Sequence, residues 1–179
     1  MSLANNESEV LVSIKSFSGK GTGVMRDTLR HLSKDIKIEK VSGIYRVDRP
    51  AESFVGIRDI RRDERLDGLA MVIKGTTTLS PAETLTTLEE IEIKMQKEVL
   101  KRTLSLNLLV YGQEIIILPS LSVPHPEMHL RPEEIIPAVE VWGEFNHPVL
   151  NKTLLELSRK YVDVSWGEYL TQGSSLLAF

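Results

Sequence analysis

Two histidines, His125 and His129, have the four-residue spacing at which histidines on one face of a helix bind zinc. Pro126 lies between them and argues against an uninterrupted helix, because proline lacks the backbone N–H that a helix interior needs. No third ligand is evident, and the chain has no cysteine to supply a thiolate. The sequence therefore predicts neither a zinc site nor thiol chemistry.

The glycine-rich segment 19–23, Gly-Lys-Gly-Thr-Gly, has the composition of a phosphate-binding loop. It lacks the Gly-x-x-x-x-Gly-Lys-Ser/Thr spacing of such loops. We interpret it as a flexible connection into a helix that begins at Thr22 or Gly23, although any helix N-terminus favours anions to some extent. No Gly-x-Ser-x-Gly elbow occurs, so serine hydrolase chemistry is not supported either.

Hydrophobic periodicity predicts the strands and helices that must position any site. Apolar, β-branched runs predict strands at 10–14, 36–45, 69–73 and 104–111, the last with a hairpin partner at 114–118. Helical spacing predicts helices over 22–32, from Ser80 for about four turns, and over 151–161. Ser80 followed by Pro81 and Glu83 is typical of a capped helix start, because Glu83 completes a capping box.

The order β-α-β-β-α-β predicts an α+β fold of the ferredoxin-like kind, an antiparallel sheet with helices packed on one face. We expect residues 1–9 to be a disordered leader and residues 10–179 to be a single domain with a C-terminal extension. The charged segment from Asp48 to Asp67 is predicted to be a solvated loop, because within 58–67 four arginines are matched by four acids. The sequence does not indicate a role for this segment or for the C-terminal tail.

Composition excludes several classes of protein. No apolar run approaches the roughly 20 residues that span a bilayer, so we do not expect a membrane protein. The first residues lack a basic segment followed by an apolar one, which argues against a secretory signal, and the absence of cysteine suits the cytoplasm. The net charge of −3 gives no basic surplus for nucleic acid. Protein partners and the oligomeric state are not indicated.

Two segments carry the strongest functional signal: 101–114, Lys-Arg-Thr-Leu-Ser-Leu-Asn-Leu-Leu-Val-Tyr-Gly-Gln-Glu, and 121–131, Leu-Ser-Val-Pro-His-Pro-Glu-Met-His-Leu-Arg. Together they resemble the signature of 6-hydroxymethyl-7,8-dihydropterin pyrophosphokinases, the HPPK family of folate biosynthesis. That signature is an Arg-Thr-Leu-Asp-Leu-Asp strand, a Gly-x-Glu turn and a Val-Pro-His segment ending in Arg. The strand at 42–46 and the helix after Ser80 resemble further family elements, so the likeness extends from about residue 10 to about residue 155.

The resemblance implies transfer of a pyrophosphoryl group from ATP to the hydroxymethyl oxygen of a pterin, with two Mg²⁺ ions. Ser105 and Asn107 stand where the family has its metal-binding aspartates. They project together, because alternate residues of a strand share a face. Neither carries a negative charge, and Mg²⁺ relies on carboxylates to replace its water. We therefore expect Mg²⁺ binding and catalysis to be weak or lost.

The resemblance also assigns nucleotide or phosphate contacts to Glu92, Arg102, Ser122, His125 and Arg131. Guanidinium and imidazole groups suit phosphate oxygens. Two other interpretations stay open: Arg102 pairs with Glu92 or Glu114, and His125, held between two prolines, bonds only to backbone. The family's Gly-Ser-Asn at the end of the first strand is replaced by Ile-Lys-Ser at 14–16, a further departure.

Three hypotheses follow. The first is an HPPK-like protein with lost or reduced catalysis that binds a nucleotide or a pterin-like small molecule. The second is a working pyrophosphokinase that recruits other acids, such as Asp48, Asp67 or Glu92. The third is an unrelated ferredoxin-like interaction module, which a structure without a cleft between the Ser105 strand and the His125 segment would favour.

Overall fold

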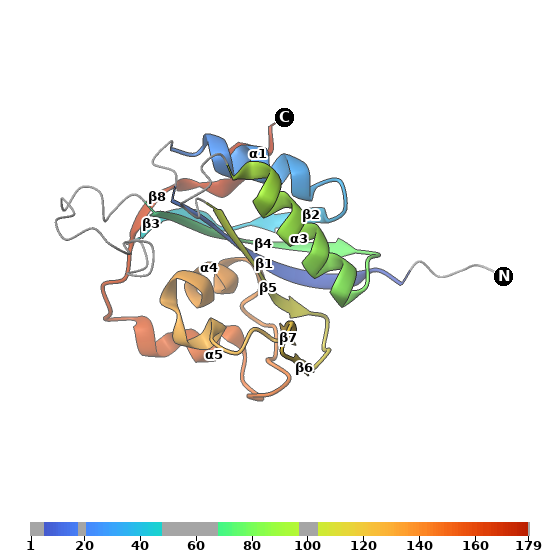
Figure 1. The fold of residues 1–179 in the computed structure, drawn as a ribbon. Coiled ribbons are helices and arrows are strands. Elements are labelled where there is room, and N and C mark those ends of the chain that lie inside the picture. Colours follow the sequence, from blue (N-terminus) through green and yellow to red (C-terminus); the bar gives the residue numbers. More distant parts are fainter. Residues whose placement is uncertain (1–5, 18–20, 48–67, 97–103, 179) are drawn as a thin grey trace, which may run out of the picture.

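The computed structural model describes residues 6–17, 21–47, 68–96 and 104–178. Its centre is a six-stranded sheet in which all strand pairs are antiparallel. The strand order is β5-β1-β4-β3-β8, and β2 also pairs with β4 (Figure 1). The strands are β1 (Ser8–Ser16), β2 (Lys37–Val41), β3 (Gly43–Val47), β4 (Gly68–Thr77), β5 (Leu104–Tyr111) and β8 (Glu168–Gln172).

One face of the sheet is covered by α1 (Gly23–Leu32) and α3 (Pro81–Met95) (Figure 1). Met25 and Leu88 of these helices pack with Val12 of β1 in one apolar cluster. The predicted capping box begins α3: Ser80 Oγ accepts from Glu83 N at 3.3 Å, and Glu83 Oε2 accepts from Ser80 N at 2.8 Å. The ferredoxin-like α+β architecture and the helices predicted at 22–32 and from Ser80 are therefore confirmed.

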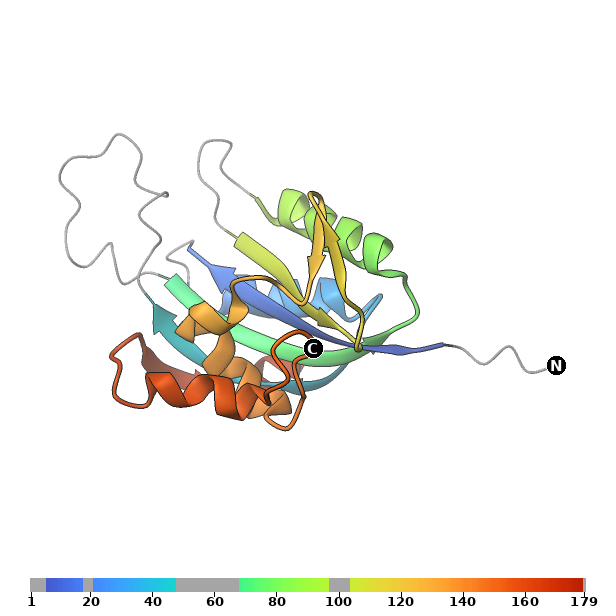
Figure 2. The ribbon, with the colours of Figure 1, turned by 90° about the horizontal axis from the view of Figure 1, so that it is seen from below.

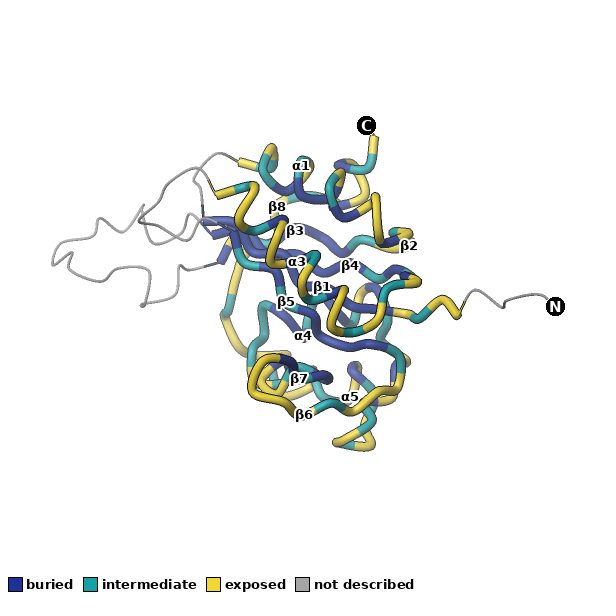
Figure 3. Tube along the Cα trace, turned by 45° about the vertical axis from the view of Figure 1, so that its right-hand side comes forward, coloured by how far each residue is buried: buried dark blue, intermediate teal, exposed yellow. Residues whose placement is uncertain are grey.

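The other face is covered by α4 (Pro132–Trp142) and α5 (Leu154–Ser158), which Figure 2 shows on the near side of the sheet. Ile135 and Val141 of α4 pack there with Leu11 of β1 and Leu109 of β5. The central strands thus have helices on both faces, which explains why β1 is buried along most of its length (Figure 3). The two helices expected on one face lie there, and α4 and α5 add a layer on the other face that the sequence did not predict.

Several predicted boundaries change. The single strand predicted at 36–45 is divided at Ser42, whose backbone N donates to Val72 O and whose Oγ accepts from Val72 N, both at 2.9 Å. The backbone N and the Oγ of Ser42 thus bond to β4 at the point between the two shorter strands. The segment 114–118 does not pair with β5, because its strand β6 (Ile116–Leu118) pairs with β7 (Leu121–Val123). The helix predicted at 151–161 is α5 followed by the 3₁₀ helix η3 (Arg159–Tyr161).

Both ends of the described chain contribute to the sheet. β1 begins at Ser8, inside the segment predicted to be a leader. At the other end, β8 pairs with β3, and the 3₁₀ helix η4 (Gly173–Leu177) buries Leu176 in the cluster under α1. Gly173 N donates to Ser42 O at 3.1 Å, and a Cβ at position 173 would lie only 2.1 Å from that oxygen, so glycine is required there.

The charged segment at 48–67 lies outside the described residues. Within the part of the chain that is described, no helix is both long and apolar enough to cross a bilayer.

Candidate functional site

The strand register places four polar side chains side by side on the α4 face of the sheet. Ser13 lies opposite Asn107, and Lys15 lies opposite Ser105, on the neighbouring strands β1 and β5. Directly opposed residues of an antiparallel pair project to the same face. The leucines at 104, 106 and 108 take the other face and pack under α3. The predicted common orientation of Ser105 and Asn107 is therefore what the structure has.

A buried carboxylate from α4 sits over this polar patch. Glu134 has no exposed surface, and its Oε1 accepts from Lys15 Nζ at 2.9 Å, from Asn107 Nδ2 at 3.2 Å and from Ser13 Oγ at 3.3 Å. The neighbouring Glu133 places its Oε1 3.5 Å from Lys15 Nζ. A buried charge is tolerated only when it is paired and hydrogen-bonded, and Oε1 of Glu134 meets both conditions.

The charge state of Glu134 follows from this pairing. Burial alone raises the pKa of Glu134, but the charge of Lys15, its hydrogen bond, and the nearby His125 and Arg131 outweigh burial and hold the pKa below its usual value. Glu134 is therefore a carboxylate at neutral pH. Its second oxygen, Oε2, is buried and has no hydrogen-bond partner among the described residues.

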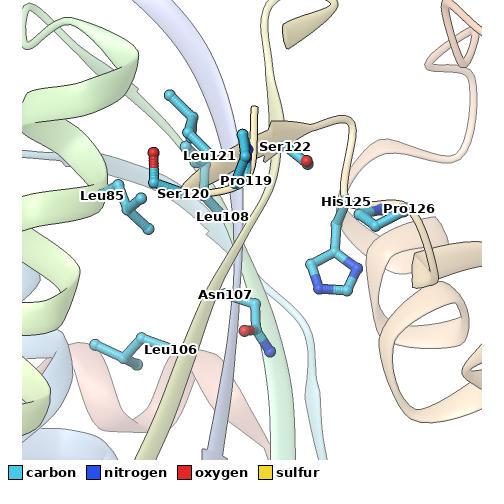
Figure 4. A pocket seen from close by; sticks show the side chains of 10 residues that line it. All are labelled: Leu85, Leu106, Asn107, Leu108, Pro119, Ser120, Leu121, Ser122, His125 and Pro126. Atoms are coloured by element: carbon cyan, nitrogen blue, oxygen red, sulfur yellow. The ribbon is translucent and has the colours of Figure 1, made fainter. Parts of the chain in front are cut away.

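His125, from the turn after β7, lies on the same side of β5 as Asn107 of the patch (Figure 4). Its backbone N donates to Leu109 O at 2.7 Å, which fixes the turn after β7 to strand β5. Its Nδ1 accepts from Glu127 N at 3.2 Å, so the neutral ring carries its proton on Nε2. Burial is the main reason why the pKa of His125 lies below its usual value. His125 thus presents a neutral imidazole at neutral pH.

A pocket of about 260 Å³ lies between β5, α3 and the β6–β7 hairpin. Figure 4 shows Asn107 and His125 on one side of β5 and Leu85 and Leu106 on the other. Ser122 also lines the pocket. The lining mixes leucine and proline side chains with polar ones, which suits a small, partly polar molecule.

Glu92 and Arg131, two further predicted site residues, are not part of the pocket lining. Glu92 of α3 accepts from Leu106 N at 2.6 Å, at the edge of β5 that does not pair with β1. The guanidinium of Arg131 contacts Glu127 and lies 3.9 Å from Glu134 Oε1.

Ser122 and Arg102 complete the set of predicted phosphate contacts. Ser122, although it lines the pocket, donates through Oγ to Leu118 O at 3.2 Å. Arg102 lies outside the described residues, so its expected contact with phosphate or with Glu92 stays a prediction.

Comparison with known proteins identifies the family. A sequence profile described as 7,8-dihydro-6-hydroxymethylpterin-pyrophosphokinase (HPPK) matches residues 11–143. The chain belongs to the HPPK family. A 2-amino-4-hydroxy-6-hydroxymethyldihydropteridine pyrophosphokinase of Haemophilus influenzae is 32% identical over 115 residues, which are 62% of this chain and 71% of that protein. One of Aquifex aeolicus is 27% identical over 151 residues, 82% of this chain and 88% of that protein.

Solved structures agree on the fold. A triple-mutant HPPK-DHPS of Plasmodium falciparum, crystallised with SDX-DHP, superposes with a TM-score of 0.67 at 15% identity. The superposition covers 90% of this chain and 45% of that one. This chain also spans only 43% of a matching pyrophosphokinase from Synechocystis. At such identity the structural likeness establishes the HPPK fold alone.

The HPPK family uses ATP and Mg²⁺, and the described residues do not fit the metal. The two positions to which the resemblance assigns the family's aspartates are neutral Ser105 and Asn107, and the amide nitrogen of Asn107 donates to Glu134. Among the described residues no group of three or more His, Asp or Glu side chains is arranged to hold a metal ion. The buried carboxylate nearest to the patch is already neutralised by Lys15.

Sequence reasoning missed Lys15 and Glu134 as members of this site. A signal for Lys15 was present, because a lysine inside the apolar run of β1 must find a counter-charge or reach solvent. For Glu134 no local signal exists, since its partners lie on strands far away in the sequence.

Proposed function

We propose that this chain is a member of the HPPK family that binds a nucleotide or a pterin-like small molecule and has lost, or nearly lost, pyrophosphoryl transfer. Family membership and the pocket between β5 and His125 support the binding role. The loss of transfer rests on one observation: the two metal-binding positions are neutral Ser105 and Asn107 beside a closed Lys15–Glu134 ion pair.

The charge balance explains why catalysis would fail. Phosphoryl-type transfer depends on cations that neutralise the phosphates and the charge that develops in the transition state. Mg²⁺ gives up water reluctantly and is held in proteins through carboxylates. A hydroxyl at 105 and an amide at 107 leave the ion in water, and the barrier to transfer then stays high.

The alternative of a working pyrophosphokinase with other acids has little support. Of the three acids that this alternative would recruit, Glu92 uses Oε1 to accept a hydrogen bond from the backbone N of Leu106. Asp48 and Asp67 lie outside the described residues. An unrelated interaction module is incompatible with the family membership, and a pocket does lie between the Asn107 strand and the His125 segment.

The direct test is turnover of ATP and 6-hydroxymethyl-7,8-dihydropterin in the presence of Mg²⁺, followed as AMP release. The Haemophilus influenzae enzyme, assayed in parallel, is the positive control. We expect AMP release by this chain to stay at the level of a sample without protein. Calorimetric titration with ATP should give the same affinity with and without Mg²⁺. Mg²⁺-dependent turnover at a rate comparable with the control would overturn the proposal.

A further inference from the structure

We infer that the Lys15 ammonium is a built-in cation that takes the place of a divalent metal ion on the α4 face of the sheet and keeps such an ion out. This inference rests on the proposed function, because it explains how the site balances its charge once metal binding and catalysis are lost. It assigns to one side chain a role that no motif in the sequence reveals.

The register of β1 and β5 fixes the position of Lys15. Lys15 is the cross-strand partner of Ser105, so its side chain emerges beside the two positions at which the family binds metal. Its Nζ lies 2.9 Å from Glu134 Oε1, and the amide nitrogen of Asn107 lies 3.2 Å from the same oxygen. The ammonium and the side chain of Asn107 are therefore neighbours on one acceptor atom.

The ion pair cannot easily open to make room for another cation. The side chain of Lys15 is 9% exposed and that of Glu134 is fully buried. If Lys15 swung out to solvent, Glu134 would keep two neutral donors and the more distant guanidinium of Arg131, 3.9 Å away, in a buried setting, which is costly. Lys15 also lies 3.5 Å from Glu133 Oε1, so a second carboxylate holds it over the patch.

Restoring aspartates at 105 and 107 would therefore not be enough to restore metal binding. A new carboxylate at 105 would face the Lys15 ammonium and pair with it. One at 107 would replace a donor to Glu134 by a like charge. A metal ion would have to compete with a cation that is covalently attached at the site. Removing Lys15 as well leaves the two aspartates beside Glu133 and Glu134, an all-oxygen set of the kind that Mg²⁺ and Mn²⁺ prefer.

The test compares Mn²⁺ binding by electron paramagnetic resonance, without nucleotide or pterin. S105D/N107D is compared with K15S/S105D/N107D, since serine leaves space and a neutral oxygen. The matched control is K74S/S105D/N107D: Lys74 also sits on the sheet and pairs with two acids, Glu9 and Glu39, but away from the patch. We expect the variant without Lys15 to bind Mn²⁺ at least tenfold more tightly than S105D/N107D, and the Lys74 control to match S105D/N107D within twofold.

A gain below tenfold, or an equal gain in the Lys74 control, would overturn the inference. Loss of Lys15 leaves Glu134 without its counter-charge, so near-UV circular dichroism must first show that each variant is folded. If K15S/S105D/N107D does not fold, Glu134→Gln is added to it and to S105D/N107D, which removes the unpaired negative charge of Glu134. The same tenfold criterion then applies to these two variants.

Failure of this inference is distinguishable from failure of the proposed function. The Mn²⁺ measurement contains no substrate, so it reports on Lys15 alone. The AMP assay uses the unaltered chain. Mg²⁺-dependent turnover by that chain would overturn the proposed function, whereas equal Mn²⁺ affinities with and without Lys15 would overturn only the role of Lys15.

Discussion

Replacement of Lys15 by methionine should destabilise the folded chain strongly, although methionine has a similar length and a fully apolar end. The side chain of Lys15 is 9% exposed, and its partner Glu134 has no exposed surface. Removing one member of a buried ion pair leaves the other charge unpaired, which costs about 3–5 kcal/mol. Two donors, Ser13 Oγ and Asn107 Nδ2, remain on Glu134 Oε1. We therefore expect the lower end of that range, about 3 kcal/mol.

The cost should depend on pH in a defined direction. In the unaltered chain Lys15 is the strongest of the groups that hold the pKa of Glu134 below its usual value, so this carboxylate stabilises the fold above its unfolded pKa. Without Lys15, burial is opposed only by the weaker effects of His125 and Arg131, so we expect the folded pKa of Glu134 to rise above the unfolded one. The folded variant then takes up a proton as the pH falls, so its deficit should shrink between pH 7 and pH 5.

Urea denaturation of K15M, E134Q and the K15M/E134Q double variant measures this coupling. A deficit of about 3 kcal/mol corresponds to a fall of roughly 6–12 °C in the melting temperature of a chain of this size. The double variant should lose less than the sum of the single losses, by about 2 kcal/mol or more, because neither partner is left charged and alone. A loss below about 1 kcal/mol for K15M, or a deficit that does not change with pH, would refute the electrostatic account.

Two further predictions concern side chains that bind backbone groups. Glu92→Leu removes the acceptor for Leu106 N, so urea denaturation should show a loss of about 1–2 kcal/mol, whereas Glu92→Gln keeps an acceptor oxygen and should lose about half as much. His147 is buried, and its Nδ1 accepts from Val149 N and Leu150 N. Burial lowers the pKa of His147. The contribution of the neutral imidazole to the stability of the fold should therefore be lost as the pH falls from about 7 through the lowered folded pKa. His147→Asn can still accept those bonds, so it should flatten the pH dependence with little loss of unfolding free energy at pH 7.5. His147→Leu should lose about 1–3 kcal/mol of unfolding free energy at every pH. An unchanged pH profile in the asparagine variant would contradict the assignment to His147.

Features that depend on neighbouring residues were predictable from the sequence. The capping box at Ser80 and Glu83 involves residues three apart, and the structure has both of its hydrogen bonds. The alternation in β5 depends only on strand geometry, and it correctly separated Ser105 and Asn107 from the leucines. The β-α-β-β-α-β order followed from these local signals.

Features that depend on distant partners were not predictable. The strand break at Ser42 depends on Val72, which offers both of its backbone groups to the serine. The helix α4 was missed because Pro137 lies inside it, and an internal proline normally marks the end of a helix. The helix persists because its apolar face, which includes Ile135, is buried against the sheet. Tertiary packing here outweighs a local preference.

The two departures at the site become consistent once their charges are considered together. Ser105 and Asn107 remove two negative charges from a patch in which the family places divalent cations. Lys15 adds one positive charge, and Glu134, fully buried, adds one negative charge that Lys15 neutralises at 2.9 Å. The two most deeply buried charges are therefore balanced without any ion. Aspartates at 105 and 107 would add two negative charges to a patch where Glu133 and Glu134 already face Lys15. In this chain Lys15 balances the negative charge of Glu134, and positions 105 and 107 are neutral. Elsewhere in the family, metal ions balance the negative charge at this place. For this reason we expect the restoration of metal binding to require changes on both strands and not on β5 alone.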